Sequence, residues 1–223
     1  CAVITGTGAV FRNAQVPAGS SGRLPWKPSS HWMTTSTSPP AARDRSSCMR
    51  RPGWRVSLCC PQPEVTSMNG VTVRAQSALE EAREAEAVIV GSGRLTREVV
   101  ADAGLMSRLA LDPSRQLIAA QCSGTLVLAR LGLLGSLPAC TDLTTRPWVQ
   151  EAGVEVLNQP FYAHGNLATA GGCLASPYIA AWLIARTEGI EAAASALHYV
   201  APVGEKEAYV ENALKRISPY LPA

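Results

Sequence analysis

The 223-residue sequence lacks the features of a membrane-spanning, secreted or disulfide-rich protein. Its longest uncharged apolar run, residues 178–185, is far shorter than the ~20 residues that a transmembrane helix needs. Its start has no basic stretch followed by an apolar stretch and a small-residue cleavage site, so no secretory signal is indicated. The seven cysteines are an odd number without paired spacing, which argues against a disulfide framework. We therefore expect a cytoplasmic protein.

Metal and nucleotide motifs are also missing. There are only three histidines, and no His, Cys or carboxylate residues have the spacing of metal ligands. The glycines at 91–93 and 171–172 form neither a G-x-G-x-x-G motif nor a P-loop. A net charge of +3 is too small to indicate binding to nucleic acid. We expect no metal, no cofactor, and no nucleic-acid or membrane partner.

Acidic residues are nearly absent from the first part of the chain. Residues 1–63 contain Asp44 alone against eight basic residues, with eight of the sixteen prolines and only seven Leu, Ile or Val. From Glu64 onward there are sixteen acidic and twelve basic residues, and long aliphatic runs. A segment so poor in apolar residues cannot bury enough surface to offset its chain entropy. The pattern predicts an irregular segment over 1–53 and a folded domain over 54–223.

Three interpretations fit residues 1–53. One is a basic disordered tail, and another is a nucleic-acid-binding arm, although its arginines are scattered rather than arrayed with aromatic residues. The third, which we favour, is a reading-frame error upstream of about Arg55. Such an error would produce a sequence rich in Pro, Arg, Ser and Cys, followed by an abrupt return to a sequence typical of globular domains.

Strand-like and helix-like stretches alternate after Trp54. Short apolar or β-branched runs predict strands over residues 55–60, 71–73, 87–90, 116–120, 154–157 and 166–170. A short polar helix is predicted over residues 77–85, and apolar residues at helical spacing predict a helix over 94–109. Further helices are predicted over residues 125–134, 176–186, 190–199 and 205–216. This alternation is typical of an α/β sandwich with a largely parallel sheet.

The most informative stretch is residues 117–129, LIAAQCSGTLVLA. An apolar strand runs directly into a helix, with Cys122 at the junction and the small residues Ser123 and Gly124 after it. Such a sharp turn is how α/β enzymes raise a nucleophile above a sheet, where the next backbone N–H can receive an oxyanion. A helix N-terminus also favours the thiolate. Alternatively, Cys122 is a buried cysteine that packs as a small apolar residue.

Three blocks in this order resemble the ThiJ/PfpI superfamily, which is related to the class I glutamine amidotransferases. They are AVIVGSG (87–93), LIAAQCSGTLVLARLGLL (117–134) and GNLATAGGCLASPYIAAWLIA (165–185). The resemblance covers residues 56–217 and implies a flavodoxin-like α/β sandwich. Cys-Ser-Gly and the pair Thr144 and Thr145 look most like the isonitrile hydratase branch. The same pattern occurs in the ligand-binding domain of AraC-type regulators.

The resemblance also implies roles for single residues. Cys122 would be the nucleophile, with a lowered pKa. The backbone N–H groups of Ser123 and of the loop formed by Gly91, Ser92 and Gly93 would form the oxyanion pocket, and the Ser123 hydroxyl would orient substrate or water. Gly124, Thr144 and Thr145 complete the candidate substrate site. The resemblance further implies a homodimer that binds a small-molecule substrate or ligand.

Two departures from the family pattern affect these roles. Relatives begin with a strand and a helix that carry a carboxylate toward the reactive cysteine, whereas residues 1–54 show no such apolar strand, so these elements look absent or replaced. Relatives of the hydratase and regulator types commonly have a His after the Thr-Thr pair, where this chain has Arg146. Arg cannot act as a base near neutral pH.

Two classes of function remain open. The first is a cysteine-dependent hydratase or hydrolase, or a degraded relative with weak or no turnover. The second is a non-catalytic ligand-binding or redox-sensing domain. We expect Cys122 to be the most reactive of the seven thiols, and the strands at 55–60, 87–90 and 116–120 to be neighbours. Cys140 and Cys173 look like packing or turn residues, although Cys173 could approach the pocket. His164 and His198 look structural.

Overall fold

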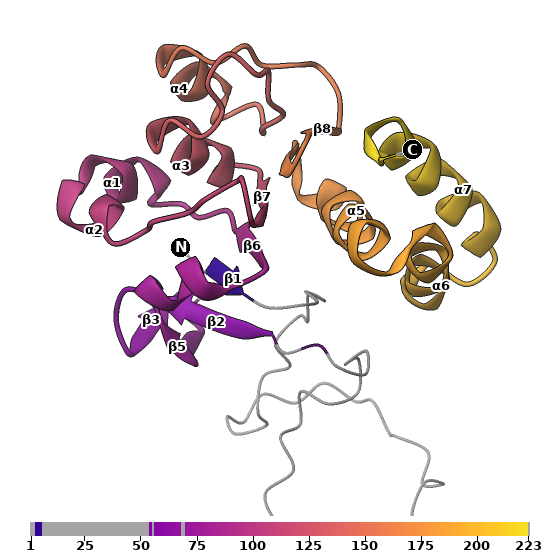
Figure 1. The fold of residues 1–223 in the computed structure, drawn as a ribbon, viewed down its shortest axis with the longest axis horizontal. Helices are drawn as coiled ribbons and strands as arrows, with labels where there is room; N and C mark the ends of the chain where they lie inside the picture. The colour runs from indigo at the N-terminus through magenta and orange to yellow at the C-terminus, as the bar shows by residue number, and fades with distance from the viewer. Residues whose placement is uncertain (1–2, 6–53, 55, 68–69, 223) are drawn as a thin grey trace, which may run out of the picture.

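The computed structural model of the protein describes residues 3–5, 54, 56–67 and 70–222 (Figure 1). Seven strands form one sheet in the order β5-β2-β1-β6-β7-β9-β8. They are β1 (Val3–Thr5), β2 (Ser57–Cys60), β5 (Ser77–Ala78), β6 (Ala87–Val90), β7 (Leu117–Gln121), β8 (Phe161–His164) and β9 (Leu167–Ala170). A separate two-stranded ribbon pairs β3 (Glu64–Thr66) with β4 (Thr72–Arg74).

Most strands of the sheet run in the same direction. β6, β7 and β9 pair in parallel, as do β2 and β5. β1 is antiparallel to both of its neighbours, and β8 is antiparallel to β9. The predicted flavodoxin-like sandwich with a mostly parallel sheet is therefore confirmed.

Helices cover both faces of this sheet (Figure 1). On one side lie α1 (Thr96–Ala101), α2 (Ala103–Ser107), α3 (Gly124–Arg130) and α4 (Arg146–Glu151). On the other side lie α5 (Ser176–Glu188), α6 (Ile190–Val200) and α7 (Lys206–Ile217). The structure also has the short 3₁₀ helices η2 (Leu79–Glu84), η3 (Cys173–Ala175) and η4 (Ser218–Tyr220). Within the described ranges, no helix has the length and apolar character needed to cross a membrane.

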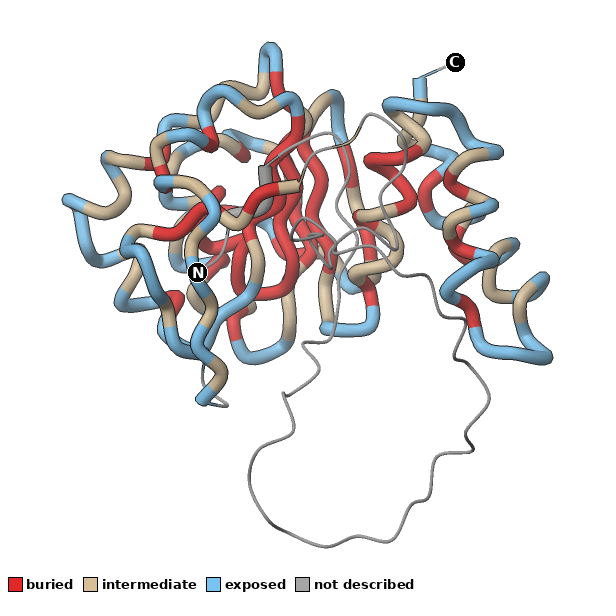
Figure 2. Tube along the Cα trace, turned by 90° about the horizontal axis from the view of Figure 1, so that it is seen from below, coloured by how far each residue is buried: buried red, intermediate tan, exposed pale blue. Residues whose placement is uncertain are grey.

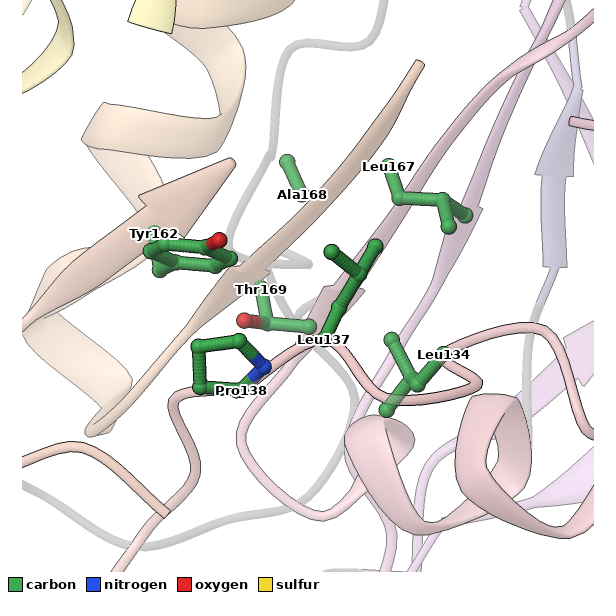
Figure 3. Close-up of a pocket in the computed structure, with 7 residues that line it drawn as sticks. All are labelled: Leu134, Leu137, Pro138, Tyr162, Leu167, Ala168 and Thr169. Atoms are coloured by element: carbon green, nitrogen blue, oxygen red, sulfur yellow. The ribbon is translucent and has the colours of Figure 1, made fainter. Parts of the chain in front are cut away.

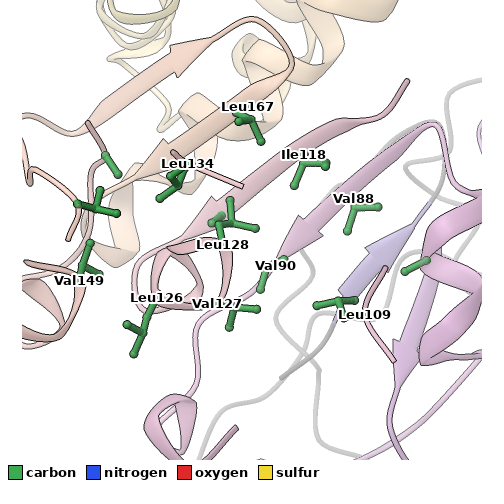
Figure 4. Packing of buried hydrophobic residues seen from close by; sticks show 14 of the residues in the cluster. Val88, Val90, Leu109, Ile118, Leu126, Val127, Leu128, Leu134, Val149 and Leu167 are labelled. Atoms are coloured by element: carbon green, nitrogen blue, oxygen red, sulfur yellow. The ribbon is translucent and has the colours of Figure 1, made fainter. Parts of the chain in front are cut away.

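The alternation of side chains along the central strands builds two cores. Val88, Val90 and Ile118 point to the side of α3, where they pack with Leu126 and Val127 (Figure 4). Ala87, Ile89 and Ala119 point to the other face and pack with α5 residues such as Trp182. Because β6 and β7 are buried on both faces (Figure 2), their sequences are continuous apolar runs rather than alternating ones.

The expected neighbours β2, β6 and β7 are not all adjacent, and this prediction was wrong for β2. β1 lies between β2 and β6, with Ile4 opposite Leu58 on one side and Ile89 on the other. Three residues are too few to show a period, so the sequence did not predict a strand there. The interpretations of residues 6–53 fall outside the described part of the chain, and the boundary at 53/54 stays a prediction.

Other elements differ in length or position from the predicted ones. The predicted helix over 94–109 is broken at Asp102, whose carboxylate caps α2 by accepting from the Leu105 N–H at 2.9 Å. The predicted strand over 154–157 is a single bridge between Ala139 and Val156. β8 and α4 were not predicted. The segment predicted as a helix over 77–85 forms β5 and η2.

Candidate active site

Cys122 occupies the turn between the end of β7 and the start of α3. Its φ is +49°, and among the residues that the structure describes it is the one non-glycine residue with a positive φ. Its N–H donates to the Ala170 carbonyl at 2.8 Å. Its own carbonyl accepts from the Thr141 hydroxyl at 2.8 Å and from the Thr125 N–H at 3.1 Å. The main chain is thus held on both sides in a conformation that residues with a Cβ rarely adopt.

Position 124, two residues after Cys122, requires a glycine because the first turn of α3 lies close against the end of β6. A Cβ on Gly124 would lie 2.3 Å from the Val90 carbonyl oxygen and 3.0 Å from that of Gly91. The end of β6 and the first turn of α3 are therefore in van der Waals contact through their backbones. This contact brings the predicted loop of Gly91, Ser92 and Gly93 beside the turn at Cys122.

Three residues form a hydrogen-bonded group, here called the hydroxyl cluster: Ser123, Thr96 and Gly93. The Gly93 N–H donates to the Ser123 hydroxyl oxygen at 3.0 Å, and the two hydroxyls are 2.9 Å apart. The Thr96 hydroxyl donates to the Gly93 carbonyl at 2.6 Å. Both side chains are buried. The cluster locks the loop to the turn, and the predicted role of the Ser123 hydroxyl toward a substrate stays a prediction.

Cys122 is a buried residue with a relative exposure of 3%. Burial raises its pKa to about 11, and the hydrogen bond from the Gln121 amide offsets only part of this increase in pKa. The expectation of a lowered pKa was wrong. The sequence shows that the thiol is at the start of a helix, but not that water is excluded from it, and loss of water disfavours the thiolate.

Gln121 is a residue of the site that the sequence analysis missed. Its Nε2 lies 3.1 Å from the Cys122 Sγ and donates to the Gly172 carbonyl at 2.6 Å. Its Oε1 is buried without a hydrogen-bond partner among the described residues. The amide thus links the nucleophile candidate to a turn fifty-one residues away. A polar residue ending an otherwise apolar strand was the one signal in the sequence.

The turn over residues 171–173 lies against the opposite side of Cys122. A Cβ on Gly171 would lie 2.6 Å from the Thr141 carbonyl oxygen, so this position requires glycine. The next residue, Gly172, has a φ of +89°. Cys173 follows at the start of η3 and is exposed. Its thiol also raises the pKa of Cys122, because a second ionisable sulfur nearby disfavours the thiolate.

The two predicted threonines have different environments. Thr144 is exposed, whereas Thr145 is buried at the start of α4. Both backbone N–H groups donate to one oxygen of Asp142, each at 3.0 Å. The negative charge of Asp142 also raises the pKa of Cys122. Asp142 was missed because its position near Cys122 depends on how the 141–145 segment folds back toward α3.

A shallow surface pocket lies beside β9. It is lined by Leu134, Leu137, Pro138, Tyr162 and three residues of β9 (Figure 3). None of the predicted site residues lines it. No group of three or more His, Cys, Asp or Glu within the described ranges is arranged to hold a metal.

Comparison with known proteins supports the fold and the order of these blocks. A profile of the DJ-1/PfpI family matches residues 45–186, which include the 91–93 loop, Cys122 and the 171–173 turn. No curated protein matches the chain.

Solved structures share the fold at low identity. A THiJ/PfpI family protein from Pseudomonas syringae has a TM-score of 0.58 at 19% identity, over 73% of this chain and 75% of that one. A mutant of a DJ-1 superfamily protein from Salmonella typhimurium has a TM-score of 0.55 at 22% identity, over 64% and 79%. A putative transcriptional regulator from Vibrio parahaemolyticus has a TM-score of 0.57 at 16% identity, over 65% and 80%.

Proposed function

Because the chain belongs to the DJ-1/PfpI family, we propose that it is an enzyme of the isonitrile hydratase type that uses Cys122 as its nucleophile. The observation that carries the proposal is the positive φ of Cys122. A left-handed conformation costs a residue with a Cβ roughly 1–2 kcal/mol, and such strain concentrates at functional sites. A cysteine used only for packing would gain nothing from this conformation.

The chemistry requires a thiolate, a small carbon electrophile and water. The Cys122 sulfur adds to the terminal carbon of an isonitrile and that same carbon takes the thiol proton, which gives a thioimidate, R–N=CH–S–Cys122. Water then adds to the same carbon and the carbon–sulfur bond breaks. The product is an N-substituted formamide, so R–NC and H₂O give R–NH–CHO and the thiol is regenerated.

The neighbouring groups suit this sequence of steps. The Gln121 Nε2, 3.1 Å from the sulfur, stabilises the thiolate each time it forms. The Ser123 N–H donates to no described residue. It can therefore donate a hydrogen bond to an oxygen that becomes anionic when water adds. For an amide or glycated substrate the same N–H would donate a hydrogen bond to the oxyanion of the tetrahedral intermediate.

A second function, ligand binding without turnover, is supported by the high pKa of Cys122. With a pKa of about 11, on the order of one thiol in ten thousand is ionised at pH 7. Arg146, at the position where relatives of the hydratase type have a His, supplies no base. The chain would then resemble the ligand-binding domain of AraC-type regulators in holding a small molecule without converting it.

The test measures formamide production from benzyl isocyanide by the wild type, Cys122→Ser and Cys173→Ser. The proposal predicts product from the wild type and Cys173→Ser but none from Cys122→Ser. The rate should rise about tenfold per pH unit between pH 7 and 10, because the thiolate fraction does. Equal rates in the wild type and Cys122→Ser would refute catalysis by Cys122. A ligand that raises the melting temperature but yields no product would establish the second function.

We also propose that the active form is a cytoplasmic homodimer. The support is the family resemblance, which implies a homodimer. Sedimentation equilibrium at 1–50 μM would show a mass twice that of the chain. A mass equal to one chain throughout this range would overturn the proposal.

A further inference from the structure

We infer that the side-chain oxygen of Gln121 binds an N–H group of the substrate, next to the carbon that Cys122 attacks. The site selects compounds in which this carbon carries a nitrogen with a hydrogen, such as an N-monosubstituted formamide. The inference deepens the proposed function and rests on it for the identity of the attacking atom. It is drawn from a buried amide that is hydrogen-bonded at one end only.

The neighbours of Gln121 fix the orientation of its amide. The Nε2 donates to the Gly172 carbonyl at 2.6 Å and lies 3.1 Å from the Cys122 sulfur. A flipped amide would place its oxygen against the Gly172 carbonyl oxygen, and two acceptors in contact repel each other. The Gln121 Oε1 therefore faces away from that carbonyl. Because Oε1 and Nε2 are bonded to the same carbon, the oxygen also lies close to the sulfur.

This oxygen is a buried acceptor without a donor. Gln121 is 5% exposed, and its Oε1 has no hydrogen-bond partner among the described residues. A buried acceptor without a donor costs free energy in the empty site, and a ligand that supplies a donor removes this cost. The oxygen is therefore suited to bind an N–H group of a ligand.

Gln116, directly before β7, shows how the fold satisfies an amide that has only a structural role. Its Nε2 donates to the Ala82 and Ala85 carbonyls at 2.9 Å and 2.7 Å. Its Oε1 accepts from the Asp112 N–H at 2.9 Å, so both ends of this buried amide are bonded. The half-bonded amide is the one beside the nucleophile candidate, which favours a role toward a ligand over a purely structural one.

A donor and an acceptor flank Cys122 in the chain. Gln121 precedes it and offers the Oε1 acceptor, whereas Ser123 follows it and its N–H donates to no described residue. Together they are complementary to a carbon that carries an oxygen and an N–H group. This arrangement is the N–H–C=O unit of a formamide.

In the proposed reaction this N–H forms when water adds. The thioimidate R–N=CH–S–Cys122 and water give R–NH–CH(OH)–S–Cys122, in which one proton of the water goes to the nitrogen. The carbon–sulfur bond then breaks, the hydroxyl proton goes to the sulfur, and R–NH–CHO leaves. Oε1 accepts a hydrogen bond from the adduct and the product but not from the isonitrile. Binding that strengthens along the reaction raises its rate.

Both loops that border Cys122 have solvent on one side. A Cβ on Gly172 would meet nothing within 4 Å, so open space adjoins the residue that holds the Gln121 amide. Ser92 and Gly93, after the end of β6, are exposed. A ligand that reaches the amide enters from this side of the sheet.

The test compares the binding of N-benzylformamide with that of N-benzyl-N-methylformamide, in which a methyl group replaces the N–H hydrogen. Calorimetry at pH 7 uses the wild type and Cys122→Ala, which cannot form a covalent adduct. We expect N-benzylformamide to bind about tenfold more tightly than its N-methyl analogue to both proteins. Equal affinities, or no binding of either probe at millimolar concentration, would overturn the inference.

Gln121→Met separates the hydrogen bond from the bulk of the added methyl group. Methionine has a similar size but no acceptor oxygen, so the tenfold preference should disappear. A preference that persists in Gln121→Met would show rejection of the methyl group by size and would refute the inference. Gln116→Met is the matched control, because it removes the fully bonded amide and should keep the wild-type preference. Circular dichroism checks that each variant is folded.

The binding result and the turnover result can be told apart. Formamide production from benzyl isocyanide tests Cys122 as a nucleophile, whereas the preference measured in Cys122→Ala tests Gln121. Product formation without a preference would support the proposed reaction and refute the role of Gln121. A preference without product would support binding through Gln121 and refute the reaction.

Discussion

The two sides of Cys122 are built in opposite ways. On one side, the hydroxyl cluster of Gly93, Thr96 and Ser123 is buried and internally hydrogen-bonded. On the other side, the 171–173 turn carries an exposed cysteine and is linked to the end of β7 through a single glutamine amide. The difference indicates that the first side fixes the main chain of the nucleophile candidate, whereas the second side contacts its sulfur through the Gln121 amide.

The largest effect should come from adding one methyl group at the tight contact on the hydroxyl-cluster side. Gly124→Ala would place a Cβ 2.3 Å from the Val90 carbonyl, so α3 must move from the sheet. We expect a loss of about 3 kcal/mol or more in the free energy of unfolding. Gly93→Ala is the control, since its Cβ would have 3.7 Å to the Thr96 hydroxyl. Similar urea midpoints for the two variants would contradict this prediction.

The pH dependence of stability tests whether the pKa of the Cys122 thiol is higher in the folded state than in the unfolded chain. The folded-state pKa of Cys122, about 11, is above the ~8.5 of a free cysteine, so the folded state holds the proton more tightly. This contribution to stability is complete below about pH 8.5 and is lost as pH rises toward 11. Between pH 7.5 and 10.5 the wild type should lose about 2.5 kcal/mol more than Cys122→Ala.

The measurement is urea unfolding at both pH values. Cys140, whose pKa burial raises to about 12, contributes in the same direction to both proteins and cancels in the difference. Equal losses in the wild type and Cys122→Ala would show that the thiol is hydrated in solution.

Removing one hydroxyl from the hydroxyl cluster should have a smaller effect. Ser123→Ala deletes the acceptor of the Gly93 N–H and the partner of Thr96, and we expect a loss of about 1–2 kcal/mol. Thr66→Ala on the β3–β4 ribbon removes an exposed hydroxyl pair of similar length, 3.1 Å to Thr72, and should cost less than about 0.5 kcal/mol. Thermal unfolding of both variants makes the comparison.

The smallest effect concerns the strain at the turn itself. Glycine usually destabilises a protein by roughly 0.5–1 kcal/mol relative to alanine, but the positive φ at Cys122 reverses this order. Cys122→Gly should therefore be about 1 kcal/mol more stable than Cys122→Ala. Guanidinium unfolding of the two variants measures the difference, and an alanine variant more stable than the glycine one would show that the turn relaxes.

Much of the fold follows from local sequence patterns. The buried strands β6, β7 and β9 and the helices α5, α6 and α7 were predicted within a few residues, because continuous apolar runs and helical spacing are properties of neighbouring residues. β1 and β8 were missed. Val3–Thr5 is too short to show a pattern, and β8 ends in the polar residue His164, so both depend on pairing with strands elsewhere in the chain.

The sequence by itself determined that Cys122 lies at a strand-to-helix turn, since an apolar strand, a cysteine and two small residues are consecutive. Only the tertiary structure decided how that thiol behaves. Its high pKa arises from burial and from Asp142 and Cys173, and its hydrogen bond comes from an amide that also holds Gly172. These residues are twenty to fifty positions away, and no local pattern encodes the exclusion of water or the distance between two loops. Such properties appear only when the parallel strands bring their carboxyl ends together at one edge of the sheet.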